Sequence, residues 1–347
     1  MKKVTLIAVI CCLAGLFLMI IAACIFRGKT TLLWSGKGST QYVKKTYECK
    51  NTINDINIEM TSDSVRVVKG NVSNIKIEYV ELPDSYVYEI DESGSNLSIR
   101  YKSIKNFPVF SVTIGINDTS MLVTVPSDFE GKLSVKSSSG SVRTEDLTLD
   151  SLDVVNTSGS IRILNCDVKN DILTKNSSGL ITYQNVNGAD ISATNTSGGI
   201  RFEGVKAAGK VETESSSGSV RLNDVTAEDD LSGKATSGSV RLEKASCEDL
   251  TLKSNSGSIH MNNVKAEGSL NAKNSSGGIH FDALEVGKDI SMSATSGSIR
   301  GTIIGSEDDY SIISKTGSGS CNLNDSRNGS KNMDVSTTSG SIKIQFD

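Results

Sequence analysis

Thr213–Leu222 (TESSSGSVRL) and Gly233–Leu242 (GKATSGSVRL) lie one repeat apart and end in the same six residues, SGSVRL. A Ser-Gly or Thr-Gly pair recurs in this way eleven times, with 19 to 23 residues between successive glycines. These reference glycines are Gly140, Gly159, Gly179, Gly198, Gly218, Gly238, Gly257, Gly277, Gly297, Gly317 and Gly340. A period of about 20 residues is typical of solenoids, in which each repeat packs only against its neighbours.

Two apolar columns accompany each glycine. The residue seven positions before it is always apolar, as at Leu231 and Leu250, and the residue two positions after it is β-branched in ten of eleven coils, as at Val220 and Val240. Outward polar residues alternate with these apolar ones, which is the pattern of a strand with one buried face. The sequence therefore predicts an all-β, single-stranded β-solenoid (β-helix) of about 20-residue coils. A two-sided and a three-sided cross-section both fit the spacing.

The turn at each Ser-Gly pair has an expected mechanism. Glycine adopts a positive φ without steric cost, so we expect it to be required by the turn geometry. The residue before the glycine is serine in ten coils and Thr316 in the other. We expect these hydroxyls to stack and to hydrogen-bond along the solenoid axis.

The sequence divides into four regions. Residues 1–29 are predicted to be an N-terminal membrane anchor, and residues 30–45 a linker. Residues 46–130 are predicted to contain a degenerate first coil, with Asp63 at the glycine position, followed by a strand-rich cap; this region holds five of the eight tyrosines. Residues 131–347 are predicted to form eleven regular coils. The final strand, Ser341–Phe346, has no cap after it, so we expect an open edge there.

Val4–Phe26 is a run of 23 residues without a charge. As a helix it would exceed the roughly 30 Å of a bilayer core, so it predicts one transmembrane helix. The expected location is the cell membrane, single-pass, with the C-terminal domain outside the cytoplasm. An alternative follows from Ile21-Ala22-Ala23-Cys24, which resembles a lipoprotein cleavage box with a lipidated Cys24.

The anchor, the strand-rich lead and the tandem S-S-G-S-V-R or T-S-G-S-I-R coils together resemble a bacterial family of membrane-anchored "putative adhesin" domains of unknown function. The resemblance covers about residues 40–347. It implies a β-solenoid outside the cytoplasmic membrane and a role in the cell envelope, alongside membrane proteins of the same operon. It implies no catalytic residues.

A basic column lies three residues after the glycines, where the alternation predicts outward side chains. Its members are Arg143, Arg162, Arg201, Arg221, Arg241, His260, His280, Arg300 and Lys343, interrupted by Thr182 and Ser320. In one interpretation, nearby acids such as Glu145, Glu203, Glu243 and Asp282 pair with it. In the other, the column binds anionic wall polymer or lipid headgroups. His260, His280 and Asp282 make an incomplete metal shell, and no metal site is predicted.

The remaining features narrow the function classes. The net charge of -4 gives no global basic field, so nucleic acid is not an expected partner. The seven cysteines form neither a disulfide framework nor a zinc motif. We predict no catalytic residues and no cofactor. The expected function is a non-enzymatic envelope protein, a rigid solenoid that binds or scaffolds envelope components. The alternatives are an envelope-stress sensor or accessory protein acting through a membrane partner, and a glycan-active β-helix enzyme.

Overall fold

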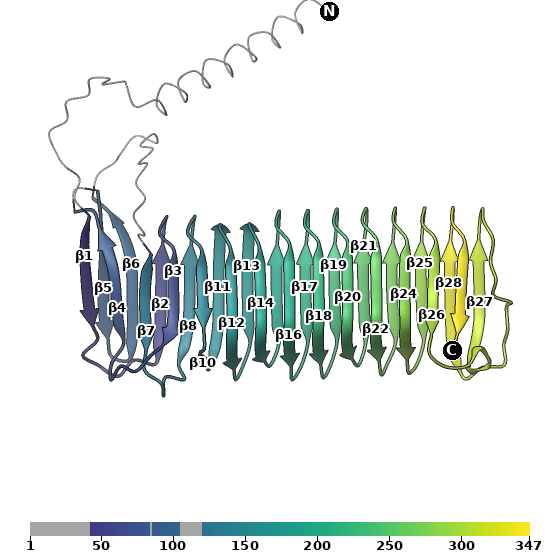
Figure 1. Cartoon of the computed structure of the whole chain (residues 1–347), viewed down its shortest axis with the longest axis horizontal. Helices are drawn as coiled ribbons and strands as arrows, with labels where there is room; N and C mark the ends of the chain where they lie inside the picture. The colour runs from purple at the N-terminus through teal and green to yellow at the C-terminus, as the bar shows by residue number, and fades with distance from the viewer. Residues whose placement is uncertain (1–41, 84, 105–119) are drawn as a thin grey trace, which may run out of the picture. The chain divides into compact units, whose positions relative to one another are not determined.

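The computed structural model describes residues 42–83, 85–104 and 120–347 (Figure 1). Tyr42–Asp347 is a compact unit whose described core is built from its own residues. It is a single-stranded β-solenoid with coils of about 20 residues, as the repeat predicted. The predicted anchor Val4–Phe26 lies outside the described residues. Within the part of the chain that the structure describes, no helix has the length and apolar character needed to cross a bilayer.

Two sheets run the length of the solenoid, and we call them sheet A and sheet B. Sheet A contains, in spatial order, β1 (Val43–Glu48), β4 (Lys76–Glu81), β7 (Met121–Val125), β3 (Val65–Lys69), β9 (Val142–Glu145), β12 (Ile161–Val168), β14 (Ile181–Gly188), β16 (Ile200–Ala207), β18 (Val220–Ala227), β20 (Val240–Cys247), β22 (Ile259–Ala266), β24 (Ile279–Val286), β26 (Ile299–Ile303) and β29 (Ile342–Phe346), with β10 (Thr148–Leu149) beside β12.

Sheet B faces sheet A across the core. Its spatial order is β27 (Tyr310–Thr316), β28 (Lys331–Thr337), β25 (Ile290–Ala294), β23 (Leu270–Asn274), β21 (Leu250–Ser254), β19 (Leu231–Ala235), β17 (Val211–Ser215), β15 (Ile191–Asn195), β13 (Ile172–Ser178), β11 (Ser151–Ser158), β8 (Lys132–Ser137), β2 (Asp55–Met60), β6 (Asn96–Ser103) and β5 (Tyr86–Ser93). A short 3-10 helix, η1 (Glu307–Asp309), precedes β27.

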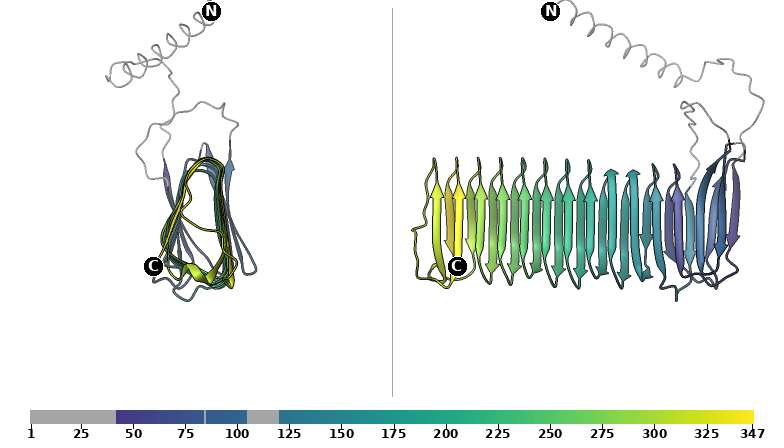
Figure 2. Two further views of the ribbon diagram at one scale, coloured as in Figure 1. Left: turned by 90° about the vertical axis from the view of Figure 1, so that its right-hand side faces the viewer. Right: turned by 180° about the vertical axis from the view of Figure 1, so that it is seen from behind.

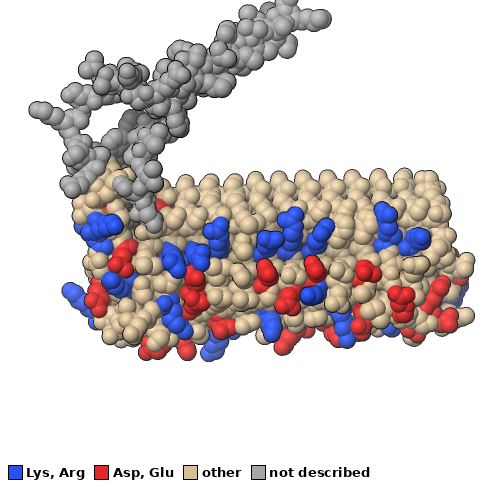
Figure 3. All heavy atoms as spheres, in the orientation of Figure 1, with Lys and Arg blue, Asp and Glu red and all other residues tan. Residues whose placement is uncertain are grey.

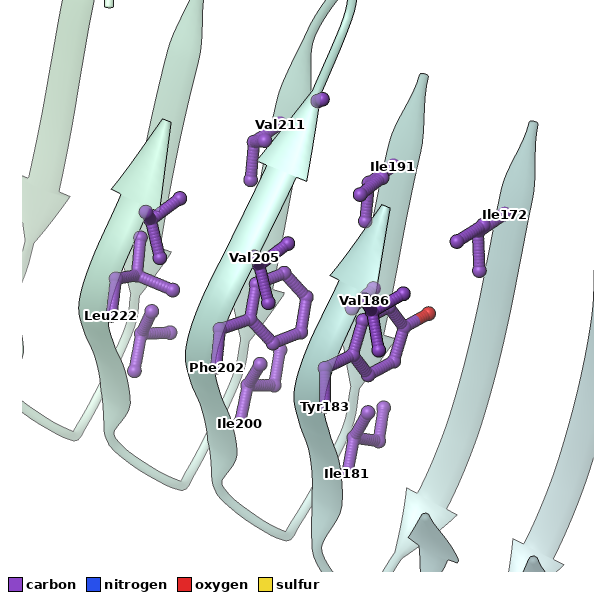
Figure 4. Packing of buried hydrophobic residues seen from close by; sticks show 14 of the residues in the cluster. Ile172, Ile181, Tyr183, Val186, Ile191, Ile200, Phe202, Val205, Val211 and Leu222 are labelled. Atoms are coloured by element: carbon purple, nitrogen blue, oxygen red, sulfur yellow. The ribbon is translucent and has the colours of Figure 1, made fainter. Parts of the chain in front are cut away.

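The inward columns predicted from the sequence are confirmed. Val220 and Leu231 are fully buried, and each stacks on its equivalents in the coils on either side. Figure 4 shows the same arrangement one coil earlier, where Tyr183 and Phe202 stack with ring centroids 4.3 Å apart. Each coil buries only a thin layer, so its apolar side is covered by its neighbours instead of by one thick core.

Sheet A bends at one residue in each of eight successive coils, a feature that was not predicted from the sequence. The bend lies six residues after the reference glycine and has a positive φ between 49° and 63°. The residues are Asp146, Asn165, Asn185, Gly204, Asp224, Lys244, Asn263 and Ala283. Asn and Asp tolerate this conformation better than other residues with a Cβ. Their side chains also form a ladder, in which Asn185 Nδ2 donates to Asn165 Oδ1 at 3.0 Å. This corner gives each coil a third short side.

The reference glycines are needed for a reason other than the one expected. Among these eleven positions only Gly159 and Gly179 have a positive φ. What the others share is close stacking: a Cβ on Gly198 would overlap the carbonyl oxygen of Gly179, and one on Gly218 would overlap that of Gly198. Any side chain at this position would push adjacent coils apart. Glycine is therefore required by the approach of neighbouring backbones, not by the turn conformation.

The hydrogen bonds along the axis also come from an unexpected residue. The side chain three positions before the glycine points inward and donates to the glycine carbonyl of the neighbouring coil. Asn195 Nδ2 reaches Gly179 O at 2.7 Å, and Ser215 Oγ reaches Gly198 O at 2.9 Å. The same bond is made by Asn156, Asn176, Ser254, Asn274 and Thr337, and also by Thr316, which stands three positions before Gly319. The structure assigns this role to that residue and not to the hydroxyl immediately before the glycine.

At the N-terminal end, the coils do not stack in chain order. The first coil, β2 and β3, contacts β8 and β9 directly, although 62 residues separate β3 from β8. The intervening strands β6 and β7 pair in parallel with the outer edges of β2 and β3. Antiparallel strands β5 and β4 then cover β6 and β7, and β1 covers β4. This cap holds a cluster of tyrosines, with Tyr88 packed against Tyr79, Tyr86 and Tyr101.

At the C-terminal end, the predicted reference glycine Gly317 and the predicted open edge at Ser341–Phe346 are both wrong. The last coil, β28 and β29, stacks on β25 and β26, and β27 lies outside it. The glycine of the outermost coil is Gly319 and not Gly317, because Gly319 lies against Gly340 O. This assignment places Cys321 next to Ile342, in the inward column.

The final strand, β29, is therefore not an open end. Asn322 covers its outer edge, donating to Ile344 O at 2.7 Å and accepting from Ile344 N at 2.9 Å. The outer edge of β27 is covered as well, since Ile312 and Ser326 exchange two backbone hydrogen bonds of 3.0 Å. Both edges are covered because the chain doubles back over β28 and β29. Residues 317–330 therefore supply the cap that was not expected from the sequence.

Candidate functional site: the basic column

Strand register brings all nine predicted residues of the basic column into one continuous row on sheet A. Arg143 pairs with Arg162, Arg201 with Arg221, and Arg221 with Arg241. The row continues through His260, His280, Arg300 and Lys343, and Thr182 lies between Arg162 and Arg201. Figure 3 shows this face, with Lys and Arg side chains following the upper half of the stack and acidic side chains below them.

Two corrections define the ends of the column. Arg66 belongs to it, because Arg66 pairs with Arg143. The sequence signal was present: Arg66 lies three residues after Asp63, which occupies the glycine position and packs against Gly140. At the other end, Asn322 replaces Ser320 as the equivalent residue, since Gly319 is the reference glycine of that coil.

The predicted acid pairing is confirmed only at the N-terminal end. Glu145 accepts a hydrogen bond from Arg143 Nε at 3.0 Å and another from Arg66 Nη2 at 2.8 Å. The hydrogen bonds from Arg143 and Arg66 are the main causes that lower the pKa of Glu145 below its ordinary value. These three side chains neutralise one another in part, so this end of the column is the less available to an outside anion.

The middle of the column is different. Among the described residues, no acidic group lies within 4 Å of the charged nitrogens of six members: Arg162, Arg201, Arg221, Arg241, Arg300 and Lys343. Glu203, Glu243 and Asp282, which were expected to pair with the column, form no ion pair within that part of the chain either. Adjacent strands lie about 4.8 Å apart, so stacked guanidinium groups without acids repel one another.

Two shallow depressions follow this unpaired stretch. One, of about 330 Å³, is lined by Arg201, Arg221, Arg241 and Glu243, among others. The next, of about 290 Å³, begins at Arg241 and extends past the two histidines. Together they form an open, cation-lined surface that follows the axis. An extended anion fits such a surface better than a small substrate, which needs a walled pocket.

The two histidines are stacked, with ring centroids 5.0 Å apart and planes inclined by 12°. Burial and, to a smaller extent, Arg241 lower the pKa of His260 below its ordinary value. Burial is also the largest cause of the lowered pKa of His280, followed by Arg300 and His260. Both rings are therefore neutral at pH 7, and the column contains an uncharged gap between Arg241 and Arg300.

No metal or disulfide site is evident in the described ranges. They contain no group of three His, Cys, Asp or Glu side chains arranged to hold a metal ion. Cys49, Cys166, Cys247 and Cys321 are free thiols.

A larger depression, of about 740 Å³, lies elsewhere, on sheet B beside β2, β6, β8 and β11. Its lining mixes charges of both signs. Arg100 lies 4.0 Å from Glu59, and Lys132 lies 4.0 Å from Asp150 beside it. Five acids and two cations line this depression, so its net charge is negative and it does not suit an anion.

The fold and this surface define the class of protein: a β-solenoid whose outward face carries a ladder of cations. Comparison with known sequences then gives the family. The profile of the Toastrack DUF4097 family matches residues 53–229 and again 180–345, so the chain belongs to that family. This result confirms the resemblance inferred from the Ser-Gly coils. A search of curated proteins found no match.

The matches among solved structures include three bacterial proteins. A "putative cell adhesion protein" from Clostridium sporogenes is 8% identical, with 88% of this chain and 100% of that one covered and a TM-score of 0.30. A "putative adhesin" from Parabacteroides distasonis is 11% identical, with 88% and 98% covered and a TM-score of 0.37. A "putative lipid binding protein" from the same species is 16% identical, with 87% and 97% covered and a TM-score of 0.35. Likenesses this distant bear on neither ligand nor activity.

Proposed function

We propose that this chain is a non-enzymatic cell-envelope protein, a rigid solenoid that binds phosphate-bearing anionic envelope components through its basic column. In this proposal Val4–Phe26 anchors the protein in the cell membrane, with the solenoid outside the cytoplasm. The observation that carries the binding role is the unpaired run Arg201, Arg221 and Arg241. Three cations held side by side without acids are favourable only if a mobile or bound anion screens them.

The open shape of the surface supports binding more than catalysis. The depressions along the column are shallow, and His260 and His280 stack on each other instead of on a carboxylate that would orient either ring for general-base chemistry. A glycan-active enzyme remains the weaker alternative. The sensor alternative depends on specific contacts by Val4–Phe26, which lies outside the described residues, or by the N-terminal cap, so it stays a prediction.

Charge reversal tests the binding role. The variant carrying Arg201→Glu, Arg221→Glu and Arg241→Glu is compared with the unchanged protein in a titration with inorganic polyphosphate at low salt. We expect at least a tenfold loss of affinity, because three cations are replaced by three anions. The matched control reverses Lys206, Lys210 and Lys244. Lys206 and Lys244 lie on the same strands as Arg201 and Arg241 but at or beyond the corner of the coil, and all three lack an acid within 4 Å among the described residues. Equal losses in both variants, or no loss in either, would contradict the proposal.

A further inference from the structure

A second row of cations lies on sheet B, where the sequence analysis had identified no site. Its residues stand four positions before the reference glycines and are exposed: Lys136, Lys175, Lys234, Lys253 and Lys273. Lys234, Lys253 and Lys273 are neighbours in register on three successive strands. Within the described ranges none of these five lysines has an acidic group within 4 Å. The row is thus as free of internal partners as the middle of the basic column.

The two rows complement each other coil by coil. Where the basic column has Thr182, the same coil has Lys175 in the second row. Where the basic column has the neutral rings of His260 and His280, the second row has Lys253 and Lys273. As a result, each of the ten coils from Gly140 to Gly297 and at Gly340 carries at least one Lys or Arg in one row or the other. Glu214 is the one acid that the two rows contain in these coils.

Between the rows runs what we call the Ser-Gly edge, the two residues immediately before each of these ten glycines. All of them are Ser, Thr or Asn, and all are exposed. In Figure 2 the outline of the solenoid is narrowest along this edge, and in Figure 3 the edge is free of charged side chains. At about 4.8 Å per coil it is a straight, convex ridge of roughly 45 Å. Leu180, 40% exposed, adds one apolar side chain beside it.

We propose that the Ser-Gly edge docks lengthwise against an anionic membrane surface, with the two rows of cations contacting lipid phosphates on either side of the ridge. This inference rests on the proposed function and names the partner of the basic column. A single polymer chain lying along sheet A would meet no cation at Thr182, His260 or His280. A planar surface approached by the ridge meets a cation at every coil, whichever flank supplies it.

The binding experiment uses Tyr42–Asp347, whose core is complete without the preceding residues, so that the predicted anchor cannot itself insert. Sedimentation measures its partition onto phosphatidylcholine vesicles with and without phosphatidylglycerol. Each Lys or Arg near an anionic surface raises the partition coefficient about fivefold. The variant Lys234→Gln, Lys253→Gln, Lys273→Gln should therefore lose roughly a hundredfold on the anionic vesicles. The variant Arg201→Gln, Arg221→Gln, Arg241→Gln should lose a similar amount.

A matched control removes the same charge elsewhere. Lys206→Gln, Lys210→Gln, Lys244→Gln should bind vesicles within about twofold of the unchanged protein. These lysines follow the reference glycine by six residues or more, roughly 20 Å along the strand from the Ser-Gly edge, and a Debye length near 10 Å screens cations at that distance. Circular dichroism verifies that each variant retains its β structure. A loss in the control equal to that in the lysine variant would overturn the proposal, because net charge alone would then explain binding.

The outcomes separate this inference from the proposed function. If the arginine variant loses affinity for polyphosphate and for vesicles while the lysine variant loses neither, the ridge is not the docking surface but the basic column still binds anions. If the protein binds polyphosphate and not the anionic vesicles, the partner is a polymer and the membrane inference is wrong. If it binds neither, both proposals fail.

Discussion

The middle and the ends of this solenoid follow different rules. In the eight coils from β11 to β26, each coil rests on the one before it in the chain, and the pattern of inward residues, glycine and outward cation repeats with little change. At both ends the coils are out of chain order. At the N-terminal end, β6 and β7 lie outside β2 and β3 although they follow them in the chain, and at the C-terminal end, β27 lies outside β28 and β29 although it precedes them. The basic column is unpaired in the middle and neutralised by Glu145 at the N-terminal end. The regular part presents the charged surface, and the irregular parts close the stack.

The largest expected effect lies in the middle. Val220→Asp should lower the free energy of unfolding by about 4 kcal/mol or more, because it buries a charge without a partner between two coils. The equivalent position at the C-terminal end is Cys321, which is only partly buried. Cys321→Asp should therefore cost less than half as much. Urea denaturation measures both, and equal costs would mean that the two positions are not equivalent.

Close backbone stacking predicts the next effect. Gly198→Ala should lower the free energy of unfolding by about 2–4 kcal/mol, since its Cβ would overlap Gly179 O and force the coils apart. Ser197→Ala, one residue away and exposed, should change it by less than about 0.5 kcal/mol. If the two substitutions had similar effects, the ladder of glycines would not be what sets the coil spacing.

The corner of each coil allows a stabilising substitution. Ala283 adopts a φ of 49°, which costs a residue with a Cβ about 1 kcal/mol relative to glycine. Ala283→Gly should therefore raise the melting temperature, by the equivalent of up to about 1 kcal/mol after the entropy of glycine is counted. Ala272→Gly, at a buried strand position in the preceding half of the same coil, should do the opposite. A decrease for both would show that the corner is not strained.

The smallest effect is at the N-terminal end and depends on pH. Because its neighbours lower the pKa of Glu145 in the folded state, this carboxylate stabilises the fold above its ordinary pKa, and that contribution is lost as pH falls through the lowered value. It should amount to less than about 1 kcal/mol. Between pH 6 and pH 3 the stability of Glu145→Gln should consequently fall less than that of the unchanged protein. Parallel curves would mean that Glu145 is not held by Arg66 and Arg143.

The features that could be predicted from the sequence are those that the residues of a single coil determine. The alternation around Val220 placed the inward columns and put Arg201, Arg221 and Arg241 on the outside, because strand geometry alone decides the face. The stacking order at the ends could not be predicted in this way, since the coils at Gly319 and Gly340 carry the same local pattern and either one could follow Gly297. The choice between Gly317 and Gly319 likewise depends on contact with Gly340, a neighbour in space but not in the repeat.

The second row of cations was missed for a related reason. Lys175, Lys253 and Lys273 are visible in the sequence, but their significance depends on lying across a narrow ridge from Thr182, His260 and His280. That relation requires knowing that the two strands of a coil meet at the Ser-Gly edge (Figure 2). The corner residues were missed because Asn, Asp, Lys, Ala and Gly all occupy them, so no single residue type marks the position.

The stacking order at the C-terminal end is the claim on which this comparison rests, and engineered disulfides test it directly. Ser291 lies opposite Asp334 on adjacent strands, whereas Ile313, which chain order would place opposite Ser291, lies two strands away. A disulfide requires Cα atoms within about 7 Å. In a background with Cys321→Ser, the pair Ser291→Cys and Asp334→Cys should crosslink on mild oxidation, and the pair Ser291→Cys and Ile313→Cys should not. Crosslinking of the second pair instead of the first would show that the coils stack in chain order.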